Sequence, residues 1–187
     1  MEQPNITDHA APDQAGGQTE TLSPALPAEI EEAASRLLEK ACDREWMLAT
    51  AESCTGGLLA SLLTDVEGAS HAFERGFVVY SEEAKCELLG IRRDQIDSCG
   101  AVSREVAIAM AEGAIQQSKA DVALSITGFA GAASGEGEPG LVHLACARRK
   151  GPTRHRERHF GDIGRGPVRI ASLKEALAMM EEAVDEG

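Results

Sequence analysis

The chain has few aromatic and few basic side chains, and each scarcity argues against a class of partner. Phenylalanine, tyrosine and tryptophan together make up only 3% of the 187 residues. Single-stranded nucleic acids are commonly held by stacking their bases on aromatic rings, so no such platform is expected. Lysine and arginine number 18 against 31 aspartate and glutamate, which gives a formal net charge of -13. Because duplex nucleic acid binds to a basic face that displaces counterions, no nucleic-acid partner is expected.

Long apolar runs and paired cysteines are also missing. No apolar stretch approaches the roughly 18 residues that a bilayer crossing requires, so no membrane partner is expected. The five cysteines are scattered, without a C-x-x-C pair and without histidines at zinc-ligand spacing. We therefore expect no metal site and no cofactor. An odd number of cysteines without a secretion signal indicates reduced thiols, and we expect a cytoplasmic protein.

Length and patterning predict one folded domain with a short segment before it. Residues 1–27 are rich in Pro, Gly, Gln, Thr, Asp and Ala and show no apolar periodicity. We interpret them as a disordered N-terminal tail. Residues 28–187 are long enough to form a single domain with a full hydrophobic core.

Apolar periodicity along this domain predicts an α/β fold. Helices are expected at 27–43, 58–64, 82–89, 103–119 and 167–184, the fourth being the longest. Strands are expected at 46–50, 77–80, 122–126, 141–147 and 153–160, with residues 91–100 irregular. Strands alternate with helices early and form a hairpin late, so we expect a three-layer α/β/α sandwich with a mixed, mostly parallel sheet. The alternating arginines of the last strand suit an edge position.

The most informative segment is Ala51–Gly57, a small polar cluster with paired glycines. It lies between a strand end and a helix start, where α/β proteins place reactive groups or bind anions. The first N–H groups of a helix lack internal partners, so a hydroxyl or thiol held there can attack while those groups hold developing negative charge. An ordinary helix cap by Ser53 or Thr55, with glycines that only permit a tight turn, explains the same residues.

Three further segments accompany this turn: Glu74–Lys85, Gly100–Ser103 and Ser125–Gly131. In this order and at these separations, the four segments resemble the CinA C-terminal domain family, from about Ala28 to the C-terminus. Characterised members of that family are nicotinamide-nucleotide amidases. The resemblance implies hydrolysis of the carboxamide of nicotinamide mononucleotide (NMN) to nicotinate mononucleotide and ammonia, a step of pyridine nucleotide salvage.

The resemblance also implies the reacting residues. Ser53 matches the family's serine nucleophile and Lys85 its lysine base, while Tyr80 and Thr127 match hydroxyl residues near the reacting centre. The chemistry agrees, because a serine hydroxyl is a weak nucleophile until a base takes its proton. Lysine is a base only when neutral, so burial or nearby cations must lower its pKa. Cys54 adjoins the serine and is intrinsically the better nucleophile if its own pKa is low.

Substrate contacts are expected from an arginine and from the two glycine-containing turns. Arg165 is the best match for the arginine that the family uses in substrate binding, and Arg169 is the second choice. A substrate phosphate requires such an arginine or a nest of backbone N–H groups. The candidate turn residues are Thr55, Gly56, Gly57, Gly128 and Gly131.

Two other functions are compatible with the same residues. The serine and lysine could cleave another small amide, or the chain could be a catalytically silent nucleotide-binding or competence-related module. Binding of NMN without turnover would select the second alternative. The Ala- and Gly-rich faces are compatible with a homodimer, which is the assembly we expect.

Overall fold

The computed structural model describes residues 26–131 and 137–186. Of the tail expected at 1–27, all but the last two residues lie outside the described residues, and so does most of the loop expected at 132–139. The described part contains one sheet with the strand order β2-β1-β3-β4-β5. The strands are β1 (Leu48–Glu52), β2 (Phe73–Val78), β3 (Val122–Gly128), β4 (Leu141–Arg148) and β5 (Arg154–His159).

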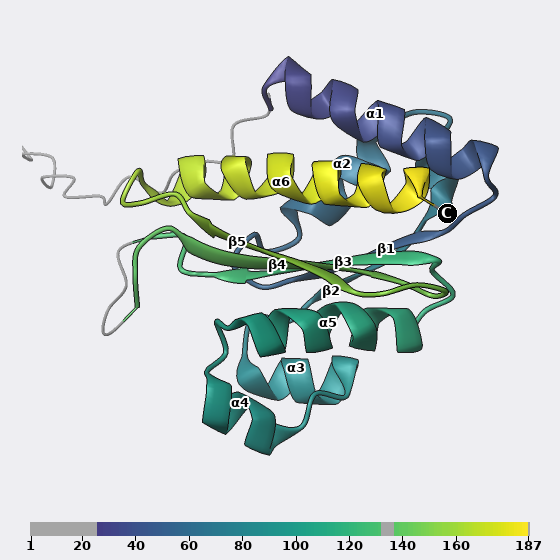
Figure 1. Cartoon of the computed structure of the whole chain (residues 1–187). Coiled ribbons are helices and arrows are strands. Elements are labelled where there is room, and N and C mark those ends of the chain that lie inside the picture. The colour runs from purple at the N-terminus through teal and green to yellow at the C-terminus, as the bar shows by residue number, and fades with distance from the viewer. Residues whose placement is uncertain (1–25, 132–136, 187) are drawn as a thin grey trace, which may run out of the picture.

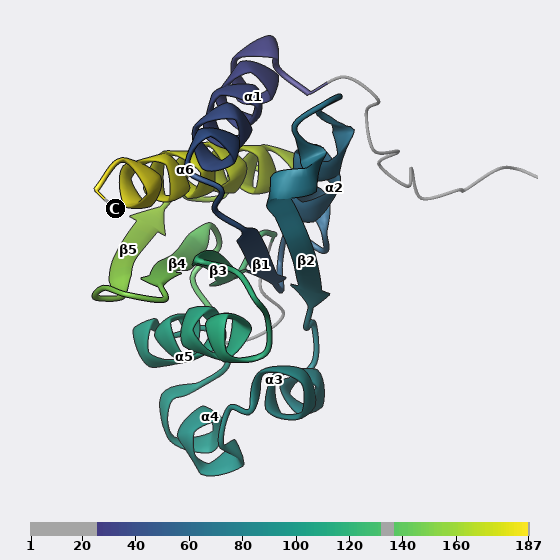
Figure 2. The ribbon, with the colours of Figure 1, turned by 90° about the vertical axis from the view of Figure 1, so that its right-hand side faces the viewer.

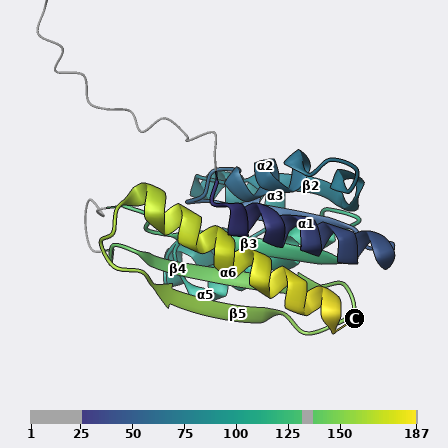
Figure 3. The same cartoon turned by 90° about the horizontal axis from the view of Figure 1, so that it is seen from above.

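Helices cover both faces of the sheet, as expected for an α/β/α sandwich (Figure 1). They are α1 (Ala28–Asp43), α2 (Leu58–Asp65), α3 (Glu82–Leu89), α4 (Arg93–Cys99), α5 (Arg104–Gln116) and α6 (Arg165–Asp185), with a short 3-10 turn η1 (Ser70–Ala72). Helices α1, α2 and α6 lie on one face, and α5 lies on the other with α3 and α4 packed beneath it (Figure 2). Seen from above, α1 and α6 run side by side across the sheet (Figure 3).

The pairing of the strands creates a point where the chain changes direction across the sheet. Strand β1 pairs in parallel with β2 on one side and with β3 on the other, whereas β4 and β5 form the expected antiparallel hairpin. The connection from β1 to β2 runs over one face and the connection from β2 to β3 runs over the opposite face. In such sheets the carboxyl ends of the two diverging strands, here β1 and β3, leave a crevice that commonly binds ligands.

Helix boundaries follow local capping chemistry where the sequence supplies it. The hydroxyl oxygen of Ser81 accepts the N–H of Ala84 at the start of α3, and that of Ser103 accepts the N–H of Val106 at the start of α5. Gly90 ends α3 with a left-handed φ of 69°. These caps and the glycine stop lie at ends of the helices expected at 82–89 and 103–119.

Three expectations about elements are wrong. Strand β2 begins at Phe73 and ends at Val78, because its pairing with β1 extends over polar residues that look like a loop. Residues 93–99, expected to be irregular, form the helix α4, in which Arg93 makes a salt bridge with Asp97 one turn later. The longest helix is α6, with 21 residues against 13 for α5, since it begins before Pro167 and runs without a break. Proline is tolerated in a first helical turn, where N–H groups lack partners.

Helices α3 and α5 approach each other closely at Gly113 of α5. A Cβ added there would lie 2.9 Å from the Cβ of Leu89 and would also meet the carbonyl oxygen of that residue. Leu89 is the last residue of α3, so this contact fixes how the helix sits beneath the sheet.

We expect Gly113→Ala to destabilise the fold, because its methyl group meets backbone that cannot rotate away. The expected loss is about 1–3 kcal/mol of unfolding free energy, or roughly 2–12 °C in the melting temperature. Gln116→Ala, on the exposed side of the same helix, is the matched control and should change stability by less than about 0.5 kcal/mol. Equal melting temperatures for the two variants would contradict the prediction, and thermal unfolding followed by circular dichroism measures both.

Candidate active site

A pocket of about 970 Å³ opens at the carboxyl ends of β1 and β3. Its walls come from the turn after β1, the segment after β2, the residues before α5, the end of β3 and the start of α6. Of the residues expected from sequence to form the site, those that line this pocket are Ser53, Tyr80, Lys85, Thr127, Gly128, Gly131 and Arg165. Those that do not are Thr55, Gly56, Gly57 and Arg169.

Ser53 and Lys85 meet at the floor of this pocket. Ser53 directly follows β1, is 8% exposed, and donates its backbone N–H to the carbonyl of Ile126 on β3 at 2.9 Å. Lys85 lies on α3, is only 1% exposed, and has its Nζ 3.3 Å from Oγ of Ser53. The same Nζ donates to the carbonyl of Val79 at 3.0 Å. The fold therefore brings together two side chains that are 32 residues apart in the sequence.

The environment of Lys85 favours the neutral amine. Burial lowers the pKa of Lys85 below its ordinary value, and this effect outweighs the opposite influence of Glu82, Cys54 and Cys86. A neutral amine carries a lone pair that can accept the hydroxyl proton of Ser53 at this distance. The fold thus brings the two groups into contact, and burial shifts Lys85 toward the neutral form that a base requires.

Cys54 lies beside this pair but is poorly suited to attack. Its side chain is buried, and burial raises the pKa of the Cys54 thiol to about 11. The thiolate, which is the reactive form, is therefore scarce at neutral pH. Between the two candidate nucleophiles left open by the sequence, the geometry and the electrostatics favour Ser53.

The glycines after Ser53 do not offer their N–H groups to the pocket. The N–H of Gly57 donates to the carboxylate of Glu52 at 3.1 Å, and the N–H of Gly56 donates to the carbonyl of Ser53 at 3.1 Å. The N–H groups of Cys54 and Thr55 are not used by these contacts. They directly follow the serine, so they are the better candidates for stabilising an oxyanion formed there.

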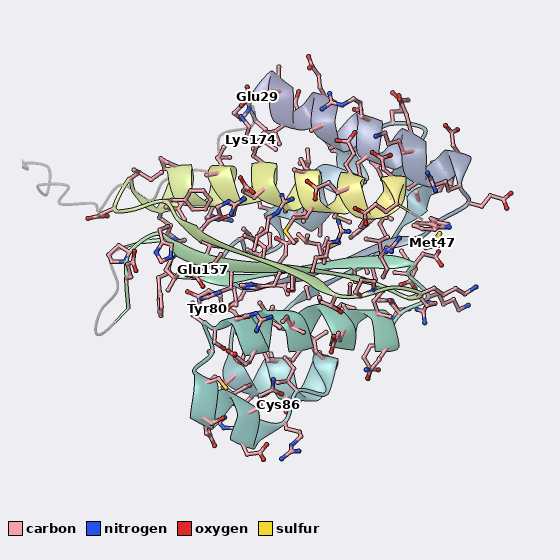
Figure 4. All side chains as sticks on the ribbon, viewed as in Figure 1. Glu29, Met47, Tyr80, Cys86, Glu157 and Lys174 are labelled. Atoms are coloured by element: carbon pink, nitrogen blue, oxygen red, sulfur yellow. The ribbon has the colours of Figure 1, made fainter. Side chains whose placement is uncertain are left out.

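Thr127 and Tyr80 both line the pocket but differ in exposure. Thr127 is fully buried on β3 and donates its hydroxyl to the carbonyl of Ala101 at 2.9 Å, which ties the segment before α5 to the sheet. Tyr80 follows β2 and is 67% exposed at the mouth of the pocket. Figure 4 shows Tyr80 toward the end of the sheet away from Met47, which precedes β1.

The two candidate arginines of α6 have different surroundings. Arg165 is the first residue of α6 and is exposed, and it lines the pocket beside Gly131, whose added Cβ would lie 3.7 Å from the Cβ of Arg165. Arg169, one turn later, donates from Nη2 to the carbonyl of Thr55 at 2.5 Å. Its Nε and the hydroxyl of Thr55 are buried without a hydrogen-bond partner among the described residues. Arg165 thus lines the pocket, whereas Arg169 holds the turn after Ser53.

Sequence reasoning missed one residue of this site, the buried Glu52. Its carboxylate accepts the N–H groups of Gly57, Leu59 and Ala60, so it occupies the N-terminus of α2 that an external anion would otherwise use. An acidic residue at the end of a buried strand, six residues before the first residue of a helix, is the signal that could have found it.

A buried lysine amine beside a serine hydroxyl, at the carboxyl edge of a mixed sheet, places the chain among α/β proteins that carry a serine–lysine pair. Its residues 30–184 match the sequence profile of the CinA C-terminal domain. The chain therefore belongs to the CinA C-terminal domain family, as the four sequence segments predicted.

Solved structures agree with this assignment. The chain is similar to the competence/damage-inducible protein CihA from Agrobacterium tumefaciens, with 42% identity and a TM-score of 0.83, over 87% of this chain and 99% of that one. It is also similar to a CinA superfamily protein from Escherichia coli, with 35% identity and a TM-score of 0.76, over 81% of this chain and 89% of that one. The expected α/β fold is thus confirmed.

Curated relatives share the family but are longer. A CinA-like protein from Syntrophobacter fumaroxidans is 42% identical over 144 residues, which cover 76% of this chain and 34% of that protein. A putative competence-damage inducible protein from Symbiobacterium thermophilum is 44% identical over 150 residues, which cover 79% and 32% respectively. The chain spans about a third of the length of these relatives.

The described residues hold no group of three or more His, Cys, Asp or Glu side chains arranged to bind a metal ion. Among their helices, none combines the length and the apolar character that a bilayer crossing demands.

Proposed function

We propose that this chain is an amidohydrolase that converts NMN to nicotinate mononucleotide and ammonia, with Ser53 as nucleophile and Lys85 as base. The observation that carries the proposal is the contact between the buried Lys85 amine and the Ser53 hydroxyl, at 3.3 Å on the floor of a ligand-sized pocket. Membership of the CinA C-terminal domain family adds support, because the resemblance implies this reaction.

The first half of the reaction forms an acyl-enzyme. Lys85 takes the proton of Ser53 as Oγ attacks the carboxamide carbon, and the N–H groups of Cys54 and Thr55 stabilise the oxyanion. The tetrahedral intermediate collapses when the C–N bond breaks, and the ammonium form of Lys85 returns its proton to the leaving nitrogen. Ammonia departs and leaves the nicotinoyl group esterified to Ser53.

The second half restores the enzyme with water. Lys85, again neutral, takes a proton from a water molecule that attacks the ester carbonyl. When the C–O bond to Ser53 breaks, Lys85 gives that proton to Oγ, and the carboxylic acid product releases its remaining proton to water and leaves as nicotinate mononucleotide. In this proposal the exposed Arg165 pairs with the substrate phosphate, and Tyr80, which also lines the pocket, contacts the bound substrate.

The direct test is ammonia release from NMN by the folded wild-type protein, with nicotinate mononucleotide quantified as the second product. Equal yields of both products would support the proposal. Binding of NMN without release of either product would instead favour a nucleotide-binding module, and release from a different small amide alone would assign another amidase activity.

Arg165→Ala is expected to weaken substrate binding rather than chemistry. Loss of a charge-assisted hydrogen bond, worth about 1.5–3 kcal/mol, should raise KM for NMN by roughly 10- to 150-fold while kcat changes little. The riboside of nicotinamide lacks the phosphate, so its kcat/KM should not change. Arg92→Ala, at an exposed arginine on the loop before α4 that is paired with Asp94, is the matched control. An unchanged KM in Arg165→Ala would remove Arg165 from the site.

A further inference from the structure

Among the described residues no basic side chain forms a salt bridge with the buried carboxylate of Glu52, which is held by backbone N–H groups at the start of α2. Glu52 is fully buried and immediately precedes Ser53. Its Oε2 accepts the N–H groups of Gly57 and Leu59, each at 3.1 Å, and its Oε1 accepts the N–H of Ala60 at 2.8 Å. A buried charge is costly unless several hydrogen bonds satisfy it, and the N-terminal end of a helix is where such bonds are available.

These contacts close a loop around the turn that carries Ser53. The chain leaves β1 at Glu52, passes through Ser53 and the two glycines, and returns to the same carboxylate at the start of α2. A change in the direction of Glu52 would therefore move both ends of the turn. On its other side, the turn is held by Arg169 through the carbonyl of Thr55.

The backbone of Glu52 also connects to Lys85. Its carbonyl accepts the N–H of Val79 at 2.8 Å, and the carbonyl of Val79 accepts the Nζ of Lys85 at 3.0 Å. Lys85 then lies 3.3 Å from Ser53, the residue next to Glu52. Four residues thus form a closed circuit of contacts, and Glu52 is its point of attachment to α2.

We propose that Glu52 is a positioning residue for the reaction, which sets Ser53 at the distance from Lys85 that proton transfer requires. It does not touch the substrate and acts through the turn alone. A misplacement of about 1 Å between reacting groups costs on the order of 100-fold in rate, so a small movement of this turn has a large effect. The carboxylate has a second effect, since its charge adds to burial in raising the pKa of the Cys54 thiol.

This inference rests on the proposed function, and the test uses Glu52→Gln in the full chain. Glutamine keeps the size of the side chain, but its NH₂ group cannot accept a hydrogen bond from a backbone N–H, so at least one of the three backbone hydrogen bonds is lost. We expect kcat for NMN to fall by about 10- to 100-fold with KM nearly unchanged. Glu52→Asp, which keeps the charge on a shorter side chain, should recover part of that loss.

The matched control is Asp121→Asn. Asp121 also accepts a backbone N–H with its carboxylate, that of Met47 at 2.9 Å, but at the opposite end of β1 from Ser53. We expect this variant to lose stability without losing kcat. A Glu52→Gln variant that is folded and retains wild-type kcat would overturn the inference, and so would equal losses of kcat in both variants.

Two measurements test the role of Glu52 without using NMN as the substrate: labelling by a fluorophosphonate and amide hydrogen exchange. A fluorophosphonate probe loses fluoride when Oγ of Ser53 attacks its phosphorus and Lys85 takes the hydroxyl proton, so its labelling rate reports the pair without NMN. Amide hydrogen exchange reports the N–H groups at 57, 59 and 60 directly. If wild type fails to hydrolyse NMN, the proposed function fails. The role of Glu52 is then still supported if these amides exchange faster in Glu52→Gln than in Asp121→Asn and if, given that the probe labels the wild type, it labels Glu52→Gln more slowly. Unchanged exchange at these amides overturns it.

Discussion

Ser53→Ala is expected to abolish hydrolysis of NMN, with kcat falling by roughly 10³- to 10⁶-fold, as for other enzymes that lose a serine nucleophile. The methyl group removes the atom that attacks the carboxamide and leaves the pocket otherwise intact. Because Ser53 is small and its structural contact is a backbone N–H to Ile126, the variant should fold and bind NMN. Ammonia release measures the loss, and calorimetric titration with NMN confirms binding.

Cys54→Ala is the matched control for this variant. The thiol is adjacent, buried and protonated at neutral pH, since burial raises its pKa to about 11. Replacing its side chain leaves the backbone N–H in place, so most of the activity should remain. The serine assignment is contradicted if Ser53→Ala keeps substantial activity, and the thiol becomes the nucleophile if the folded Cys54→Ala variant alone is inactive.

Lys85→Arg is expected to lower kcat by about 10²- to 10⁴-fold, the usual contribution of a positioned general base. Arginine has a long cationic side chain, but its guanidinium does not lose a proton in proteins. A role for Lys85 as a neutral base therefore predicts loss of activity, because arginine supplies a cation but no base. If Lys85 served only as a cation, the arginine variant would keep much of the activity.

The pH dependence of the wild type tests the same role. Lys85 must be neutral to act, and burial lowers its pKa below the ordinary value, so kcat/KM should rise with pH through that lowered pKa and then level off. Lys85→Arg should lack this rise. Lys174→Arg is the matched control, since Lys174 is exposed and paired with Glu29 on the far side of α6 (Figure 4). Equal activity of the two arginine variants would remove Lys85 from the reaction.

The features that could be predicted from the sequence are those determined by residues close together in the chain. The hydroxyl caps at Ser81 and Ser103 and the glycine stop at Gly90 depend on neighbouring residues, so they could be recognised without knowledge of the fold. Ser53 was found in the same way, because a small polar turn between a strand and a helix is a local pattern. Strand β2 was misplaced because its boundaries depend on pairing with β1, and pairing is set by residues far away in the chain.

The remaining parts of the site depend on tertiary contacts. Burial of Lys85 lowers its pKa, and that burial arises from the packing of α3 under α5 and the sheet. The division of labour between Arg165 and Arg169 depends on where α6 crosses the turn after Ser53. The position of Glu52 at the end of a strand and before a helix is a local sign, but its three backbone partners, at the N-cap and in the first turn of α2, are identified only by the fold.

The circuit of contacts that joins Glu52, Ser53, Val79 and Lys85 exists only in the folded chain. Its members come from two different strand-to-helix connections, which meet only after β1 and β2 have paired. In an unfolded or partly synthesised chain, Lys85 is an ordinary charged, solvated side chain, and Ser53 is an ordinary alcohol. In the proposed mechanism, Ser53 therefore becomes reactive only in the completed fold, and a misfolded chain holds it as an unactivated alcohol.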